Sequence, residues 1–372
     1  MRIAWFSPER PAFGEEATAP LLAALGKRHA VDVISEARAH DMVWANHRGL
    51  YDLSVYALDN SPEAAYLWPY LLRYPGLTLL LNSSLVASRS ASLFRERLSS
   101  RLQDEREFPE AGSWPLLWPA LGASRLTVVP HRGIAAALQV EYPDAHVAAM
   151  TVPCPGLEAP APDLPPGPLT IGCVAPTPHT RALVDRAVAR ARDIGIEVRL
   201  CEAEDVDGVI AGSHVVLALQ WPTAGRLQAA AVRAMASGRP TIVFETIETA
   251  DWPAWDPQTW QRRDVADPTE PACITLDIRD DEHSLVLCLR RLTTDPVLLA
   301  SLATGARAWW ARTASPEVAV PAFEALMEQA RTLSPPARRT AWPAHLTDDA
   351  TGLTRETLET FGLTLEALVP LR

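Results

Sequence analysis

A strand, a helix and a second strand follow one another in the stretch HVVLALQWPTAGRLQAAAVRAMASGRPTIVF, residues 214–244. Residues 214–219 are almost entirely apolar, as expected of a strand buried in a parallel sheet. The Ala-rich segment 226–237 predicts a helix, with Thr223 as its N-cap and Gly238 as its C-terminal stop before the strand 241–244. A unit of this kind predicts a parallel α/β sheet.

The same alternation of apolar runs and amphipathic segments continues on both sides of this unit. Short apolar runs predict strands, and longer segments with apolar residues three or four apart predict helices. The expected strands are 2–7, 30–34, 53–56, 77–81, 126–130, 169–174 and 197–201. The expected helices are 17–27, 63–73, 91–104, 132–141, 181–195, 284–292, 297–313 and 316–331. The fold class is therefore expected to be α/β, with two Rossmann-like domains.

The length and one proline-rich stretch indicate how the chain is divided. It has 372 residues, about twice the length of a common domain. Prolines interrupt residues 152–168, which cannot form regular structure. We place an N-terminal domain at 1–154, a C-terminal domain at 155–331, and a C-terminal extension at 332–372. The extension either packs back on the N-terminal domain or is loosely attached.

Charge excludes one class of partner. The net charge is −11, from 34 basic and 45 acidic residues, so a basic coat that binds nucleic acid is not expected. Lys27 is the only lysine, and its setting fits neither a phosphate loop nor a Schiff-base site. The apolar runs are too short for a transmembrane segment or a signal peptide, and we expect a cytoplasmic protein.

Several motifs of common enzyme classes are missing. The five cysteines lie far apart and lack the spacing of a zinc or redox site, so we expect free thiols and no metal site. The glycine fingerprints of dinucleotide and P-loop folds are missing, as are the zinc-protease helix and the serine-hydrolase elbow. For the four large classes of enzyme that carry these motifs, the sequence therefore offers no main support.

The first of two candidate phosphate sites lies at 175–181, where a helix is expected to begin at the carboxyl end of a strand. Thr177 can cap this helix, and Arg181 can fold back over the same end. Free N–H groups and the helix dipole favour an anion there. An arginine in a first turn opposes the dipole, so its presence suggests a bound anion that compensates.

The second candidate site lies at 220–226, before the Ala-rich helix. Gly225 lets a ligand approach the backbone, and Arg226 adds a permanent positive charge. The alternative for both sites is an ordinary exposed arginine in an Arg-rich chain. The residues alone leave the two interpretations about equally supported.

The stretch from Met1 to about residue 331 resembles glycosyltransferases of the two-Rossmann-domain, or GT-B, architecture, most closely the retaining family four. The opening MRIAWFSP, residues 1–8, is similar to the family's first strand and loop. The segments 51–56, 60–62 and 71–76 resemble one bacterial branch. The strongest match is WPTAG at 221–225, continuing to RAMASGRPTIV at 233–243. Asp295 and Pro296, with the helix after them, resemble the usual C-terminal end.

The resemblance implies two domains that face each other across a cleft and bind a nucleotide-diphosphate sugar, mostly through the C-terminal domain, without a metal ion or further cofactor. Arg181 stands near the family's catalytic basic residue. The implied donor-binding residues are Thr177, Thr180, Thr223, Gly225, Arg226, Arg233 and Glu245. The implied acceptor-side residues are Gly14, Glu15 and Asn82.

The sequence also departs from the family pattern. Gly225 and Arg233 stand where the family has two glutamates that bind donor hydroxyls, and an arginine cannot accept those hydrogen bonds. Glu245, Glu248 or Asp251 can substitute. The residues 82–88, NSSLVAS, replace the His-Asp pair and later His of the related branch.

Two functions follow from this pattern. The first is a glycosyltransferase that moves a sugar to an unidentified glycan, lipid or protein acceptor. The second is an inactive glycosyltransferase-like binding or scaffold protein that partners an active homologue. Another sugar-nucleotide enzyme of the same fold, such as an epimerase, is a third option, and a homo-oligomer is compatible with each.

Overall fold

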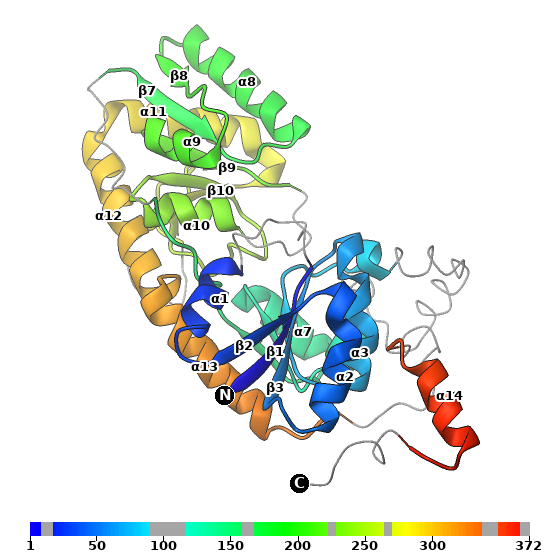
Figure 1. Cartoon of the computed structure of the whole chain (residues 1–372). Helices are drawn as coiled ribbons and strands as arrows, with labels where there is room; N and C mark the ends of the chain where they lie inside the picture. Colours follow the sequence, from blue (N-terminus) through cyan, green and yellow to red (C-terminus); the bar gives the residue numbers. More distant parts are fainter. Residues whose placement is uncertain are drawn as a thin grey trace. The chain divides into compact units, whose positions relative to one another are not determined.

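The computed structural model of the chain describes residues 1–8, 18–89, 117–157, 167–221, 228–263, 270–336 and 349–364. The chain divides into two compact units (Figure 1). The first comprises Met1–Met150 and Val320–Arg372, and the second comprises Thr151–Ala319. The boundary between Ala319 and Val320, where the chain returns to the first unit, falls within one helix, α13 (Pro316–Thr332). The first unit is therefore discontinuous in sequence, and the second is continuous.

The first unit is built on a six-stranded sheet in the order β2-β1-β3-β4-β5-β6, and every pairing is parallel. Its strands are β1 (Arg2–Phe6), β2 (Ala30–Ile34), β3 (Leu53–Leu58), β4 (Leu77–Leu80), β5 (Leu126–Val129) and β6 (Val147–Ala149). Its helices are α1 (Ala19–Leu25), α2 (Ala39–His47), α3 (Leu67–Arg73), α6 (Trp118–Ala123), α7 (Arg132–Glu141), part of α13, and α14 (Gly352–Thr360).

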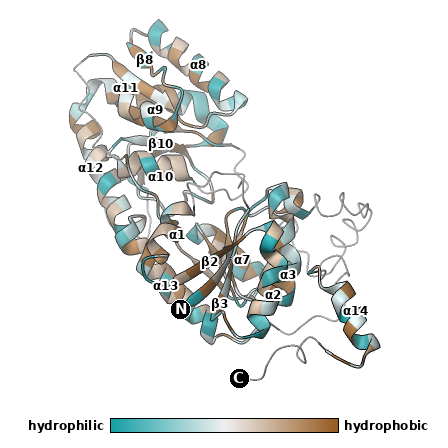
Figure 2. Ribbon diagram, in the orientation of Figure 1, coloured by the Kyte–Doolittle hydropathy of each residue, from teal (hydrophilic) through white to brown (hydrophobic). Residues whose placement is uncertain are grey.

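Apolar side chains alternate across the strands of the first unit and are covered on both faces. On one face, Phe6 stacks on Tyr56 with ring centroids 4.8 Å apart, inside a cluster that includes α2, α3, α6 and α7. On the other, Trp5 meets Phe323 of α13 at 6.1 Å. Figure 2 shows the central strands as the most hydrophobic part of this unit. Burial on both faces explains why these strands read as continuous apolar runs.

The second unit repeats this design with a six-stranded parallel sheet in the order β11-β12-β10-β9-β7-β8. Its strands are β7 (Leu169–Cys173), β8 (Val198–Leu200), β9 (Val215–Ala218), β10 (Thr241–Phe244), β11 (Ala254–Trp255) and β12 (Cys273–Leu276). Its helices are α8 (Pro178–Asp193), α9 (Val206–Gly212), α10 (Ala229–Ala236), α11 (Asp281–Thr294) and α12 (Pro296–Thr313). Helices α8 and α11 pack on one core cluster, and α9 and α10 on the other.

The strand order creates a switch point between β7 and β9. The chain leaves β7 toward β8 on one side and returns to β9 on the other, so consecutive crossovers run in opposite directions. The helices that follow β7 and β9 pack on different core clusters, α8 on one and α10 on the other. In open α/β sheets the carboxyl ends of the strands beside such a switch point are the common place for a ligand.

Most of the expected elements are confirmed, and β2, β10 and α7 have the expected bounds. The Ala-rich helix was expected to begin at Arg226 under a Thr223 cap, but α10 begins at Ala229. The residue before it, Gln228, has ψ 48°, outside the helical range, and its side chain makes no cap bond. The expected stop is confirmed, because Gly238 has φ 73°. The expected helix 91–104 lies outside the described residues.

Short elements were missed. The helices that were not predicted are α2 and α9, and the strands that were not predicted are β6, β11 and β12. The expected helix 63–73 is a 3₁₀ turn, Pro62–Tyr66, followed by α3. No helix in the described part of the chain combines the length and the hydropathy needed to cross a bilayer.

Candidate functional site

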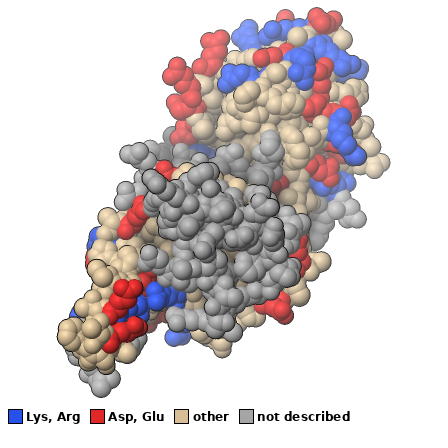
Figure 3. Space-filling view, turned by 90° about the vertical axis from the view of Figure 1, so that its right-hand side faces the viewer, with Lys and Arg blue, Asp and Glu red and all other residues tan. Residues whose placement is uncertain are grey.

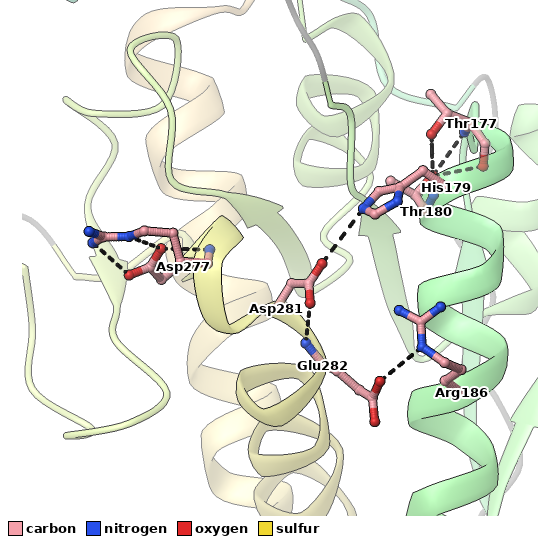
Figure 4. A network of polar contacts seen from close by, with 8 residues as sticks. Thr177, His179, Thr180, Arg186, Asp277, Asp281 and Glu282 are labelled. Carbon is pink, nitrogen blue, oxygen red and sulfur yellow. Dashed lines mark hydrogen bonds and ion pairs between the residues drawn. The ribbon is translucent and has the colours of Figure 1, made fainter.

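The N-terminus of α8 lies at the switch point and has the cap that its sequence predicts. Thr177 precedes the helix in an extended conformation, and Pro178 occupies the first helical position. The Thr177 Oγ1 atom accepts from the Thr180 N–H at 3.2 Å, while the Thr180 Oγ1 accepts from the Thr177 N–H at 2.8 Å (Figure 4). This reciprocal pair fixes the direction of the chain where α8 begins.

The capping box leaves a defined donor at this helix end. Pro178 has no N–H, and the N–H of Thr180 is held by Thr177. The N–H of Arg181 donates to the Thr177 carbonyl at 2.9 Å. The N–H of His179 is the one in this turn that these bonds do not use. As in other helices, this N–H group points along the axis at the positive end of the helix dipole, and such helix ends commonly bind anions.

Arg181 lines a cavity of about 700 Å³ beside this helix end. No hydrogen bond or ion pair joins its guanidinium to another described residue, whereas Arg186 and Arg190 of the same helix both pair with Glu282. At the top of Figure 3, in the second unit, basic and acidic side chains are interspersed. An arginine without a carboxylate partner in such a surface is available to bind an anionic ligand.

The backbone between β7 and α8 is strained. Ala175 has φ 45°, in the left-handed region that favours glycine, and it lines the same cavity. Non-glycine residues in this region cost about 1 kcal/mol or more, and such residues are enriched at ligand sites. The strain brings the loop 174–177 to the edge of the cavity.

Two neighbouring strand ends carry buried polar atoms without partners. The Oε1 of Gln220, just after β9, and the Oγ1 of Thr246, just after β10, accept or donate no hydrogen bond within the described residues. A buried polar atom in this state costs about 1–3 kcal/mol. Both atoms lie at the carboxyl edge of the sheet, where a bound ligand would satisfy them.

Contacts between α8 and α11 hold the site in place. His179 Nε2 lies 3.8 Å from Asp281 Oδ2, and Arg186 donates to Glu282 at 2.9 Å (Figure 4). Asp281 and Glu282 form the first turn of α11, where acidic side chains favour the helix dipole. The interactions of Arg186 and Arg190 hold the pKa of Glu282 below its usual range. The start of α8 is therefore tied to a second helix of the same unit.

The other residues expected to bind the nucleotide-sugar donor lie farther from the start of α8 or outside the described residues. Thr223, Gly225 and Arg226 lie outside the described residues. Arg233 lies within α10 and binds Asp207 of α9 through two bonds of 2.6 and 2.7 Å. Glu245 follows β10 at the carboxyl edge and accepts from Arg263 Nη2 at 2.8 Å. The structure thus brings Thr177, Thr180 and Arg181 together, with Glu245 at the same sheet edge.

On the first unit, Gly14 and Glu15 lie outside the described residues. Asn82 follows β4 and is buried, and its Oδ1 accepts from the Ser84 N–H at 2.9 Å. This is a local turn bond. Asn60, after β3, makes a longer-range bond, because its Oδ1 accepts from the Ala87 N–H at 2.7 Å.

Sequence reasoning missed several groups around the candidate site. Thr246 comes just after β10, and that position was the only available signal for it. Gln220 opens the second candidate site, 220–226, but no role was predicted for its side chain. The carboxylates of Asp185, Glu202 and Glu204 line the cavity together with Arg181, but they come from two different segments that only the fold brings together. Within the described ranges, no three His, Cys, Asp or Glu side chains are grouped so as to hold a metal ion.

No protein-family model matches the chain, and no curated protein matches it significantly. Solved structures do match. The catalytic domain of starch synthase IV from Arabidopsis thaliana, bound to ADP and acarbose, is 11% identical with a TM-score of 0.53, over 89% of this chain and 99% of that one. Anabaena Alr3699/HepE, in complex with UDP-glucose, is 11% identical with a TM-score of 0.52, over 88% and 99%. A glycosyltransferase from Rickettsia africae is 12% identical with a TM-score of 0.50, over 90% and 99%.

These similarities establish the fold. The chain has the two parallel α/β units of the GT-B glycosyltransferases, over most of its length. The fold class expected from the sequence is confirmed.

Proposed function

We propose that this protein is a glycosyltransferase that moves a sugar from a nucleotide-diphosphate sugar to an acceptor. The observation that carries the proposal is the N-terminus of α8, where Arg181, which pairs with no carboxylate among the described residues, lines a cavity beside the carboxyl ends of β7 and β8. The fold shared with HepE, which was solved with UDP-glucose, supports it.

The chemistry assigned to this site is stabilisation of the departing nucleoside diphosphate. As the bond between the sugar and the diphosphate breaks, negative charge grows on the diphosphate oxygens. The N–H of His179, the helix dipole and the Arg181 guanidinium would face that charge. Because the capping box fixes the backbone where α8 begins, the His179 N–H would not need to reorganise during the reaction. In this proposal neither a metal ion nor a further cofactor takes part.

The sugar and the acceptor would use other residues of the proposed site. Glu245 can accept hydrogen bonds from sugar hydroxyls through the oxygen that Arg263 does not bind, and Gln220 and Thr246 offer unsatisfied polar atoms nearby along the sheet edge. The acceptor would bind the first unit near the carboxyl ends of its strands, where Asn82 lies. The acceptor is a glycan, a lipid or a protein.

Nucleotide binding tests the first part of the proposal. A nucleoside diphosphate at about 100 times its Kd should add about 2.7 kcal/mol of stability, visible as a rise in Tm. Arg181→Ala should weaken binding at least about tenfold, or 1.4 kcal/mol. Arg190→Ala is the matched control, because it removes an exposed arginine farther along the same helix. If no nucleoside diphosphate raises the Tm of the unaltered protein, the proposed function is wrong.

Transfer itself needs a second experiment. Release of nucleoside diphosphate from a set of nucleotide sugars should be detectable and should fall strongly in Arg181→Ala. Binding without any release or transfer would support the alternative, a glycosyltransferase-like protein that binds nucleotides but has lost the reaction. One observation favours that alternative: Arg233, at the position of a family glutamate, is engaged by Asp207.

A further inference from the structure

The cavity beside Arg181 is lined by one arginine and by several carboxylates. Arg181 stands in the first turn of α8, after β7, while Glu202 and Glu204 follow the neighbouring edge strand β8. Asp185 lies one turn after Arg181 along α8. A ligand whose phosphates reach Arg181 would therefore also lie beside carboxylates of the lining.

Three carboxylates of the cavity lining have no partner among the described residues. Asp185, Glu202 and Glu204 make no hydrogen bond or ion pair with any described residue. Asp205 differs, because its Oδ1 caps α9 by accepting from the Gly208 N–H at 2.6 Å. Arg181 and Asp185 are four residues apart on one helix, the usual spacing of an ion pair, yet they do not pair. Three side chains that can only accept hydrogen bonds thus face the cavity without a donor.

Between these charged groups the walls of the cavity are apolar. They are formed by Val174, Pro176, Val184, Leu200, Val206 and Val209. A volume of about 700 Å³ lies in the range of small-molecule sites, and a lining that combines apolar walls with a few polar groups suits a heterocycle.

From these features we propose that the cavity selects a guanine nucleotide, so that the donor substrate is a guanosine-diphosphate sugar. This inference rests on the proposed function and names its donor. Guanine presents two adjacent N–H donors, N1–H and the N2 amino group, which match the two oxygens of one carboxylate. Adenine offers only its amino group on that edge. Uracil and thymine offer one N–H between two carbonyl oxygens, and those oxygens would be repelled by a carboxylate.

Binding of four nucleotides separates these cases. We expect GDP to bind at least about tenfold more tightly than UDP or dTDP, with ADP between them, in titration calorimetry of the full chain. A tenfold ratio corresponds to 1.4 kcal/mol, within the range of about 1–3 kcal/mol of discrimination for one good bidentate pair. UDP or dTDP binding as tightly as GDP would overturn the guanine inference but would leave the proposed function intact. If none of the four binds, the proposed function itself fails.

Charge-neutral variants locate the recognition. Glu202→Gln and Glu204→Gln replace an acceptor by a group that also donates, so at least one should lower the affinity for GDP while leaving the affinity for UDP unchanged or higher. The matched control is Glu197→Gln, an exposed glutamate before β8 at the opposite end of that strand. Equal losses for GDP and UDP in both cavity variants would contradict the assignment.

Protection of Cys201 from alkylation tests guanine selection without a measurement of affinity. Cys201 also lines the cavity and is partly exposed. Bound GDP should slow alkylation of Cys201 by iodoacetamide, measured by peptide mass spectrometry, with UDP at the same concentration giving less protection. Equal protection by both nucleotides, at concentrations where GDP saturates, would count against guanine selection.

Discussion

The carboxylate of Asp349 lies 2.8 Å from the guanidinium of Arg73 in the first unit, and the Asp349 side chain is completely buried. Arg73 ends α3, whereas Asp349 stands just before α14, 276 positions later by the difference of the two numbers. Tyr74 donates to the same carboxylate at 3.0 Å, and Arg355 of α14 lies 3.4 Å from it. This carboxylate attaches the C-terminal segment to the first unit.

Asp349→Asn should release this segment. The change leaves two arginines without their buried counter-charge, which typically costs about 3–5 kcal/mol. Trypsin should then cut after Arg355 much faster than in the unaltered protein. Asp144→Asn, at an exposed aspartate, is the control. Unchanged cleavage in Asp349→Asn would show that other contacts hold the segment.

Low pH should release the C-terminal segment, as the Asp349→Asn substitution does. Burial alone would raise the pKa of Asp349, but hydrogen bonds from Thr351 and Tyr74 and the charge of Arg73 hold it below its usual range. A carboxyl group with a lowered pKa contributes stability above its unfolded pKa, about 3.9, and loses it as the pH falls through the folded value. The protection of the α14 amides, that is, the intrinsic exchange rate divided by the measured rate at the same pH, should therefore stay constant near neutrality and fall only below about pH 4.

The capping box of α8 predicts a second effect on stability. Thr180→Val keeps the shape of the side chain but removes the Oγ1 that accepts from the Thr177 N–H. We expect a loss of about 1 kcal/mol in the free energy of unfolding, together with weaker nucleotide binding. Thr180→Ser retains the hydroxyl and should remain close to the unaltered protein in urea unfolding. Equal stability of the valine and serine variants would contradict this role.

Gly305 of α12 packs closely against the loop before β12. A Cβ at this position would lie 2.2 Å from the carbonyl oxygen of Pro271, and that backbone cannot move as a side chain can. Gly305→Ala should cost about 2 kcal/mol or more. Gly122→Ala is the control, because nothing lies within 4 Å of its Cβ and the site is helical. That change should be neutral or stabilise by about 0.4–1 kcal/mol. Thermal unfolding of the two variants gives the comparison.

The thiol of Cys173 should react slowly at neutral pH. Burial raises its pKa to about 11, although the charge of Arg181 opposes this shift. Because only the thiolate is nucleophilic, alkylation should accelerate about tenfold per pH unit between pH 8 and pH 10. The same cysteine in the unfolded chain, with a pKa of about 8.5, should level off much earlier. Arg181→Ala removes the opposing charge and should slow the reaction further.

The pair of Arg233 and Asp207 can be measured by a double-mutant cycle. Its geometry is bidentate, but Asp207 is half exposed, so solvent screens much of the attraction. We expect a coupling energy of about 0.5–1 kcal/mol between Arg233→Ala and Asp207→Ala in urea unfolding. Strictly additive losses would show that the contact contributes nothing to stability in solution.

Interactions between residues close together in the sequence could be predicted, whereas those between distant residues could not. The cap at Thr177 is local, because both partners lie within four residues, and it was predicted correctly. The parallel sheets were also predictable, since strands such as 126–129 are buried on both faces and read as apolar runs. The partner of Arg233 was not predictable, because Asp207 belongs to a helix of only seven residues that has no clear apolar period.

The carboxylates that line the cavity were unpredictable for a related reason. Glu202 and Asp185 come from different elements, and only the pairing of β7 with β8 brings their segments to one place. A long-range arrangement of this kind leaves no mark in the spacing of residues. The start of α10 was misplaced because helix propensity favours residues 226–228, while the backbone at Gln228 is not helical.

The division of the chain also determines the order in which the two units can be completed during synthesis. A ribosome releases the N-terminal part of the first unit before the second unit, yet the first unit needs Phe323 against Trp5 and Asp349 against Arg73, and both Phe323 and Asp349 follow the second unit in the sequence. The second unit is continuous from Thr151 to Ala319 and has all its strands before then. The second unit can therefore finish folding first, and the first unit stays incomplete until Phe323 and Asp349 have been synthesised.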